Sequence, residues 1–565
     1  MDNEKNNNVE EKIEENLGDV KEDVVVENNP SPKKNGNGLL IIAIIFLSIL
    51  VGVGATIGII SLFNKGENNG GSTSPKNLKS EYRLQGNGLE KFDLYFLKIE
   101  NEKVNKIYSP LSIKYALEML NEGANGNTKA QIDAIIGDYE ARSYTNSSNM
   151  SFANALFIRD TFASAIKEDY KNKLINKYNA EVIVDPFESA NRINKWVKDK
   201  TLNLLDNLVY DVSDLDFALI NALAIDMEWE HKFFKPINSY VDYSHEILKT
   251  DKNVGIGWLA PLEVGILDFE DVNEKVSGMR IDASFNKYDI IKELGEENIR
   301  KTVGDEYKKY MQENPTYGCY EVESCGGKKY EELTEEEIEV VVKAYLDTYI
   351  EEISKNYKKY GYNTDFSLYT DDKVRVFAKD LKEYNGTTLQ YIGIMPIEES
   401  LDSYIENVSA EEVNRIISNL KELKLDSFKE GYFTRITGFI PKFDFEYELD
   451  LKADLNKLGV VDVFDGSKAD LTNIVSSKGA YIETAKHKAN IEFTQDGIKA
   501  AAATFEGGAG AGGMFDYLFE VPTEVIDLTF DRPYMFIIRD KSTGEVWFTG
   551  TVYEPVEHVP NTSGY

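Results

Sequence analysis

Residues 492–533 read EFTQDGIKAAAATFEGGAGAGGMFDYLFEVPTEVIDLTFDRP, and the rest of the chain is best understood from this stretch. A strand pattern leads into four alanines and a threonine at 500–504. A glycine-rich tract follows at 507–513, and large apolar residues then stand at 514, 515 and 517–519. A second strand pattern begins near Val525. Small side chains have little apolar surface to bury, so they cannot anchor a loop in a core. They can slide between two strands, which predicts a loop able to become a central strand.

The composition excludes several classes of function. The chain has 565 residues, a formal net charge of −34 and an isoelectric point near 4.6. A strongly acidic surface repels phosphate backbones, so we expect no nucleic-acid partner. Two cysteines argue against a disulfide scaffold. With four histidines and no HExxH or CxxC pattern, we expect neither a metal site nor a cofactor.

The N-terminal residues predict a membrane anchor. Residues 1–38 are polar and acidic, and their composition is typical of a disordered tail. Residues 39–63 are uncharged and apolar, and 25 residues at 1.5 Å rise per residue exceed a hydrocarbon core of about 30 Å. The sequence therefore predicts an uncleaved transmembrane signal-anchor helix. The alternative is a cleaved signal peptide, but the apolar run and its acidic leader are long for one.

The charges beside this apolar run set its orientation. Lys33 and Lys34 precede it, whereas Lys65 and Glu67 follow it. The slight basic excess favours a cytoplasmic N-terminus and an extracellular main domain. Residues 64–79 form a polar linker rich in Gly, Ser and Asn. The folded part is expected over 80–565.

Helical and strand patterns alternate after residue 80. Apolar residues at helical spacing run from Ile113 to Leu120, and a new helix is expected near Thr128. Residues 151–160 predict a buried strand, and the apolar run over 219–229 is typical of a central strand buried on both faces. These patterns predict an α+β fold.

Ten short segments of the chain resemble segments of one known protein family and occur in the same order as in that family. The sequence resembles the serpin family, which implies a serpin fold with three β-sheets, eight to nine helices and an exposed reactive-centre loop, here preceded by the transmembrane helix. The segments are SPLSI (109–113), ANGNT (124–128), NALFI (154–158), INKWVKDKT (193–201), INALAIDMEW (220–229), IPKFDFEYELDLKADLNKLGVVDVFD (440–465), ADLTNI (469–474), HKANIEFTQDG with KAAAAT (487–504), FDRPYMFIIRD (530–540) and GEVWFTGTVYEP (544–555).

An insertion of helical character is expected at about 250–370, where no family pattern is found. Thr334 and Glu337 form a capping-box pattern before apolar residues at helical spacing up to Ile353. A second helix is expected over about 287–311. Cys319 and Cys325 lie between the two helices, and a small disulfide and free thiols are equally open. The insertion is either a recognition surface or an elaboration without chemistry.

The resemblance also assigns candidate residues, while no catalytic motif is present. Buried hydroxyl, amide and imidazole groups must be paired, and a polar cluster beneath the main sheet, at the point where its strands part, is implied for Ser109, Ser112, Asn221 and His487. Trp229 matches a tryptophan at the point of loop entry. Lys442 matches a lysine that pairs with a glutamate at the base of the loop, but Gln495 stands in the place of that glutamate, so at most a hydrogen bond is expected.

The implied mechanism is suicide inhibition. A protease attacks the loop and forms an acyl-enzyme, and the freed N-terminal part of the loop then inserts into the main sheet. Gly497 supplies a pivot, Lys499 is expected to point to solvent, and Ile498 departs from the usual small residue. The predicted hinge is Gly497, Ile498, Lys499, Ala500, Ala501, Ala502, Ala503 and Thr504.

The scissile bond and the target stay open. Family spacing places the bond at Ala511–Gly512, within two or three residues, but the patch over 514–519 offers better side chains for a specificity pocket. We expect a monomer and a serine protease of elastase-like or subtilisin-like type as partner. The alternatives are a papain-like cysteine protease as target, or a non-inhibitory serpin that acts as a binding module.

Overall fold

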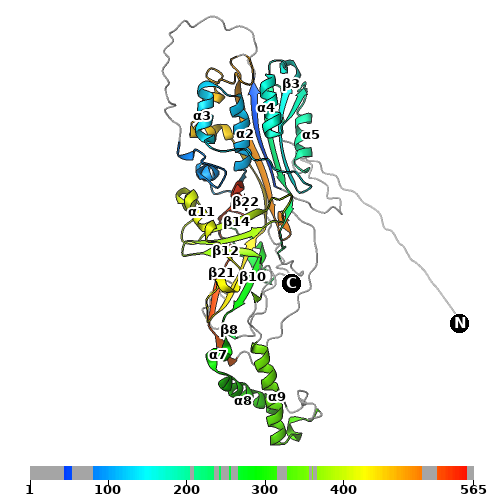
Figure 1. Cartoon of the computed structure of the whole chain (residues 1–565), viewed down its shortest axis with the longest axis vertical. Helices are drawn as coiled ribbons and strands as arrows, with labels where there is room; N and C mark the ends of the chain where they lie inside the picture. The colour runs from blue at the N-terminus through cyan, green and yellow to red at the C-terminus, as the bar shows by residue number, and fades with distance from the viewer. Residues whose placement is uncertain are drawn as a thin grey trace, which may run out of the picture. The chain divides into compact units, whose positions relative to one another are not determined.

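The main sheet is the centre of the fold, and Figure 1 shows its long strands beside α2, α4 and α5. A computed structural model describes residues 44–53, 80–203, 209–233, 241–242, 254–255, 265–314, 327–354, 359–360, 365–476, 478–498 and 518–555. In spatial order the main sheet contains β17 (Phe443–Leu449), β18 (Tyr481–Phe493), β1 (Ile44–Val53), β5 (Phe217–Ile225), β3 (Met150–Arg159) and β4 (Glu181–Asp185).

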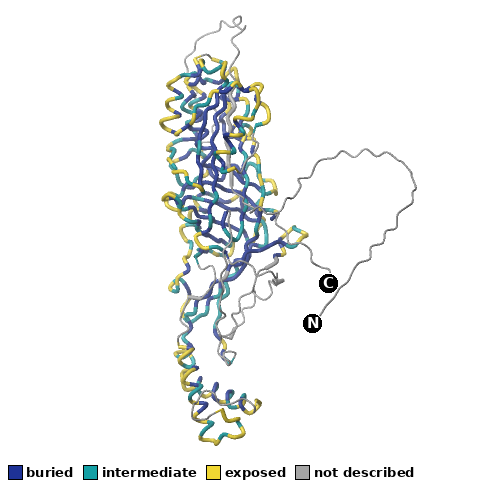
Figure 2. Tube along the Cα trace, turned by 90° about the vertical axis from the view of Figure 1, so that its right-hand side faces the viewer, coloured by how far each residue is buried: buried dark blue, intermediate teal, exposed yellow. Residues whose placement is uncertain are grey.

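Strand β5 is buried along its whole length, as its apolar run predicts. Alternate residues serve two cores because side chains in a strand alternate between faces. Leu219 and Leu223 join the large core that also contains residues of α2 (Pro110–Gly123). Ile220 joins a second core with residues of α5 (Asn191–Lys200). Helices therefore cover both faces of the sheet, and Figure 2 shows buried residues concentrated there.

Two further large sheets continue the fold. One contains β21 (Thr523–Asp527), β16 (Phe433–Pro441), β10 (Val276–Asn286), β9 (Gly265–Leu267) and β7 (Val241–Asp242), with β11 (Lys359–Tyr360) paired to β10. The other contains β15 (Lys421–Glu422), β12 (Phe366–Thr370), β13 (Val374–Asp380), β14 (Leu389–Pro396), β22 (Tyr534–Asp540), β23 (Val546–Val552) and β2 (Lys106–Tyr108). The remaining strands of the described residues form two short pairs, β19 (Gly497–Ile498) with β6 (Met227–Glu228) and β20 (Glu520–Val521) with β8 (Val254–Gly255).

The described residues contain eleven α-helices, more than the eight to nine expected. Three of them, α7 (Ile290–Leu294), α8 (Glu296–Glu313) and α9 (Glu335–Ser354), lie in the predicted insertion and form a helical hairpin. The others are α1 (Tyr95–Ile99), α2, α3 (Gly126–Ile136), α4 (Glu168–Tyr178), α5, α10 (Leu401–Asn407), α11 (Ala410–Ser418) and α12 (Leu451–Leu458).

The helical hairpin has its own apolar core. Val341, Leu346 and Tyr349 of α9 are buried against α8. The predicted capping box is present, because Thr334 Oγ1 accepts from Glu337 N over 3.2 Å and Glu337 Oε2 accepts from Thr334 N over 2.9 Å. Cys319 and Cys325 lie outside the described residues.

The conformation of the apolar segment near the N-terminus differs from the predicted helix. The sequence predicts a transmembrane helix over 39–63, whereas Ile44–Val53 forms strand β1 in the main sheet. None of the helices in the described ranges combines the length and apolar character that crossing a bilayer requires. An Ile- and Val-containing run has high strand propensity, and a central strand position is as apolar as a bilayer, so one pattern suits both environments. The predicted tail (1–38) and linker (64–79) lie outside the described residues.

Candidate functional site

The candidate site is the position between β5 and β18, here called the central position. Strand β1 occupies it and is antiparallel to both neighbours, so β5 and β18 run parallel to each other. Just beyond the end of β5, Gly497 pairs with Glu228 and Ile498 pairs with Met227. Ile498 has 0% exposure, so this β-branched side chain is accommodated in the core.

The first hinge residues enter the central position above β1. A tight turn, in which Thr494 N donates to Gly497 O over 3.2 Å, reverses the chain after β18. Strand β19 ends opposite Met227, and β1 begins with Ile44 opposite Ile225. The two strands thus fill successive parts of the same position. The remaining predicted hinge residues, 499–504, and the predicted reactive bond at Ala511 and Gly512 lie outside the described residues.

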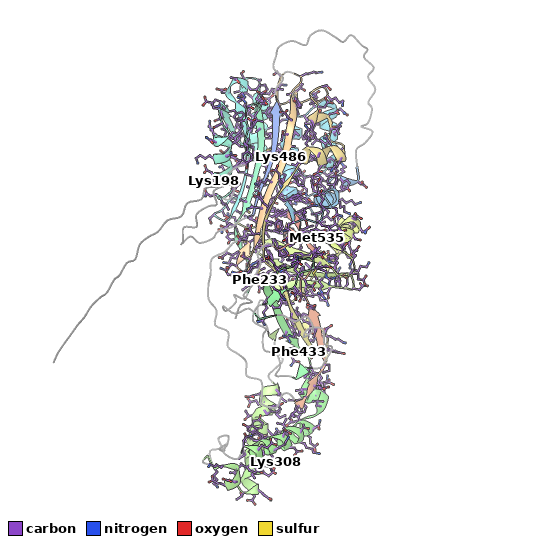
Figure 3. The ribbon with its side chains drawn as sticks, turned by 180° about the vertical axis from the view of Figure 1, so that it is seen from behind. Lys198, Phe233, Lys308, Phe433, Lys486 and Met535 are labelled. Atoms are coloured by element: carbon purple, nitrogen blue, oxygen red, sulfur yellow. The ribbon has the colours of Figure 1, made fainter. Side chains whose placement is uncertain are left out.

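Trp229 holds the turn that precedes the hinge. Its indole Nε1 donates to Thr494 O over 2.9 Å, and its backbone N donates to Asp496 O over 3.3 Å. The side chain is fully buried, with edge-to-face contacts to Phe233 and Phe493. Figure 3 labels Phe233 at this end of the long strands. The predicted loop-entry tryptophan therefore contacts the residues from which the loop departs.

A chain of charges that the sequence did not reveal braces the same turn. Glu228 forms ion pairs with Lys382 and, over 3.2 Å, with Lys232, and Lys232 Nζ lies 3.5 Å from Asp496 Oδ1. The hydrogen bond from Lys382 is the largest cause that lowers the pKa of Glu228. No spacing rule connects positions 228, 382 and 496, because only the folded chain brings them together.

At the base of the loop, Gln495 contacts Asp496 and Phe233, and Lys442 contacts Ser277. Gln495 Nε2 donates to Asp496 Oδ2 over 3.1 Å, and Gln495 O accepts from Phe233 N over 2.8 Å. The backbone N of Lys442 donates to Ser277 O over 3.1 Å. The amide of Gln495 is thus used locally, within the turn.

Ser109, Ser112 and His487 form one buried group. Ser109 caps α2, where its Oγ accepts from Ser112 N over 3.0 Å, and Ser109 N donates to His487 Nε2 over 2.9 Å. All three residues have 0% exposure. Burial lowers the pKa of the His487 imidazole to about 3, so the ring is neutral at ordinary pH and accepts this hydrogen bond. The serine–histidine contact is inaccessible to a substrate and runs through a backbone N–H, so it is no hydrolytic dyad.

Asn221 lies across the central position from His487, and its side chain binds Asn154, which the family resemblance did not assign to the cluster. Asn221 Nδ2 donates to Asn154 Oδ1 over 2.7 Å, and Asn154 Nδ2 donates to Tyr178 O over 2.8 Å. In the sheet register, Ser48 of β1 stands opposite both Asn221 and His487. In the register of the sheet, the polar residues Asn154, Asn221, Ser48 and His487 therefore stand side by side on four neighbouring strands. The signal was an asparagine inside each of two apolar runs, NALFI and INALAI.

The described residues contain no metal-binding group at this site. Among them, no group of three or more His, Cys, Asp or Glu side chains could hold a metal ion. The arrangement provides a sheet that holds one strand, β1, between β5 and β18, and a loop whose first residues already lie at the entrance of that position.

Comparison with known proteins identifies this arrangement. The family model described as Serpin (serine protease inhibitor) matches residues 91–242 and 347–555. Human Serpin B3 is 23% identical over 505 residues, which cover 82% of this chain and 97% of that protein. Leukocyte elastase inhibitor A of Mus musculus is 30% identical over 190 residues, which cover 34% of this chain and 46% of that protein.

The architecture is similar to that of a solved protein. The crystal structure of the thermophilic serpin Tengpin in the native state matches 82% of this chain and 93% of its own, with 19% identity and a TM-score of 0.50. The family model leaves residues 243–346 unmatched, and α7, α8, β10 and the first part of α9 fall in this gap.

Proposed function

This chain belongs to the serpin family, and from that premise we propose that it is an irreversible suicide-substrate inhibitor of a serine-type endopeptidase. The protease attacks a peptide bond in the loop after β19 and becomes acylated by the N-terminal part of the loop. The freed part then inserts into the main sheet between β5 and β18 and carries the protease with it.

One observation carries this proposal. Gly497 and Ile498 pair with β6 at the entrance of the central position, and β1 fills the rest of that position. The sheet of this chain therefore accommodates a strand antiparallel to β5 and β18, and the hinge is aligned to supply one in place of β1. The residues that follow, Ala500 to Ala503 and Thr504, are small and uncharged, as a buried central strand requires.

The energy for loop insertion comes from pairing and burial. An inserted strand hydrogen-bonds to both neighbours, whereas an exposed loop bonds to water. Continuing the register of Ile498 with Met227 would place Ala500 opposite Ile225, where β1 begins with Ile44. The loop and β1 would therefore use the same pairing partners, so β1 must leave before the loop inserts.

We also propose that residues 39–63 anchor the chain in a membrane as a single-pass segment, with the serpin domain outside the cell. The uncharged run of 25 residues supports this anchor. A segment cannot span a bilayer and pair within the sheet at the same time. Membrane insertion would thus leave the central position open to the loop.

The test is incubation of the full chain, both in detergent and in lipid vesicles, with a panel of elastase-like, subtilisin-like and papain-like proteases, followed by denaturing gels. We expect an SDS-stable adduct with a serine protease and a released C-terminal peptide. Adducts with papain-like proteases alone would change the target class to cysteine proteases. Clean cleavage without adduct across the whole panel would rule out the inhibitor.

A second candidate function is a non-inhibitory serpin that acts as a binding module. The pairing of β1 with both β5 and β18 favours it, because a sheet that keeps its central position filled cannot take up the loop. The same gels separate the two functions, since a loop that never inserts is cleaved as an ordinary substrate.

A further inference from the structure

The residues that follow the loop, 518–527, form a segment here called the C-terminal stem. The stem is attached at two places. Strand β20 pairs with β8, and β21 pairs in parallel with β16, where Phe433 N donates to Pro522 O over 2.8 Å. Thr434 Oγ1 also donates to Glu524 Oε2 over 3.1 Å. The backbone of the stem is therefore fixed from Glu520 onward.

The side chains at the start of the stem belong to the core of the helical hairpin. Phe519 is 6% exposed and Val521 is 4% exposed, and both are members of the apolar cluster that contains Ile299, Tyr307 and Leu346. Leu518 and Phe433 pack against the same cluster. This cluster is separate from the two cores of the main sheet. The hairpin thus uses part of the C-terminal stem to complete its own core.

The location of the contact agrees with the chain path. Figure 1 places α7 and β8 beside the end of the orange-red strand that follows the loop, and Figure 3 labels Phe433 between the main body and the helix that carries Lys308. Residues more than 160 positions apart in the sequence, such as Leu346 and Phe519, therefore share one core. The residues that directly follow the loop in the sequence therefore pack against the hairpin.

We propose that the helical hairpin clamps the C-terminal stem and sets the limit of the segment a protease can use. A protease needs an extended, accessible backbone around the scissile bond, with a side chain free to enter its specificity pocket. Phe519 is buried in the hairpin core, and Leu518 packs against that core while partly buried, so neither side chain is free to enter a specificity pocket. The scissile bond lies before Leu518, which leaves Met514, Phe515 and Tyr517 as the large apolar residues of the patch that can be read.

This inference rests on the proposed function only in that a protease attacks the loop. Cleavage is mapped by mass spectrometry of the C-terminal peptide after brief treatment of the full chain with each protease of the panel. We expect the peptide to begin at residue 518 or earlier for every first cleavage within the loop. A first cut that gives a peptide beginning at Phe519 or Glu520 would overturn the clamp. Cleavage before residue 518 without an adduct would instead contradict the proposed inhibitory function and would still support the clamp.

A matched pair of variants tests the packing itself. Val521→Ala and Val340→Ala remove the same two methyl groups, but Val521 is buried in the hairpin core whereas Val340 of α9 is 50% exposed. We expect Val521→Ala to increase amide hydrogen exchange in α8 and α9 several-fold and Val340→Ala to leave it unchanged. Equal exchange in the two variants would contradict a shared core.

Discussion

Ser109, the N-cap of α2, donates its backbone N–H to Nε2 of His487 on β18 over 2.9 Å, and this bond joins the helix beneath the main sheet to one of the two strands that flank the central position. A protonated imidazole cannot accept it. The contact between α2 and β18 at this point therefore requires His487 to be neutral.

The first prediction concerns acid stability. Burial lowers the pKa of His487 to about 3 from its ordinary 6.5. Between these pH values the unfolded chain binds a proton that the native chain does not bind, so the free energy of unfolding falls as pH drops from 6.5 toward 3. The expected loss is on the order of a few kcal/mol. Urea denaturation at pH 7 and pH 4.5 measures it.

The control for this effect is His487→Gln, whose amide oxygen can accept from Ser109 without titrating. We expect this variant to show a smaller difference in stability between the two pH values than the natural chain. Identical differences would mean that other groups cause the acid sensitivity.

The second prediction concerns the hinge. In the register of β19, Ala502 would enter opposite Leu223, in a strand position where β5 is fully buried. Ala502→Glu would place an unpaired carboxylate there, which costs several kcal/mol. Insertion should fail, and the variant should be cleaved without forming an adduct on denaturing gels. Ala502→Ser serves as the control and should retain adduct formation, whereas an adduct with the Glu variant would refute the hinge.

Local patterns predicted the parts of the site that depend on neighbours in the sequence. The burial of β5 followed from its apolar run, and the helix start at Thr334 followed from the spacing of Thr334 and Glu337. The family resemblance added Trp229, which lies at the turn before the hinge. Such features are set within a few residues, so a sequence contains them directly.

Contacts between distant segments could not be predicted in this way. The bond of Asn154 to Asn221 depends on the register of β3 against β5, and the packing of Phe519 depends on a hairpin far away in the sequence. The placement of Ile44–Val53 in the sheet differs from the expectation for another reason. Bilayer and central strand are both apolar environments, so hydropathy alone does not distinguish a helix in one from a strand in the other.

The third prediction concerns the connection that follows the C-terminal stem. Gly438 of β16 lies against the backbone of Leu528 and Thr529, and an added Cβ would stand 2.4 Å from the carbonyl carbon of Leu528. Gly438→Ala must therefore push the two backbones apart, which should lower the free energy of unfolding by about 1–3 kcal/mol or more. Urea denaturation measures the loss. Gly88→Ala, with nothing within 4 Å of its added Cβ, should change stability little, and equal effects would contradict the close approach.

The last prediction tests the occupant of the central position. Leu50 of β1 pairs directly with Leu219 of β5. Opposite residues in an antiparallel pair have Cα atoms about 4.5–5.5 Å apart, within the range that a disulfide bridges. With Cys319 and Cys325 changed to Ser, the double variant Leu50→Cys with Leu219→Cys should cross-link under mild oxidation of the detergent-solubilised chain, as seen by mass spectrometry of proteolytic fragments.

The matched control pairs Leu50→Cys with Leu156→Cys, since Leu156 stands opposite Leu219 on the far side of β5. Two strand spacings separate these positions by roughly 10 Å, too far for a disulfide. Cross-linking of the control, or its absence from both variants in detergent and in lipid vesicles, would contradict strand β1. Cross-linking in detergent that disappears in vesicles would show that the bilayer removes the segment from the sheet. Adduct formation should then be faster in vesicles, because the loop no longer competes with β1 for the pairing partners on β5 and β18.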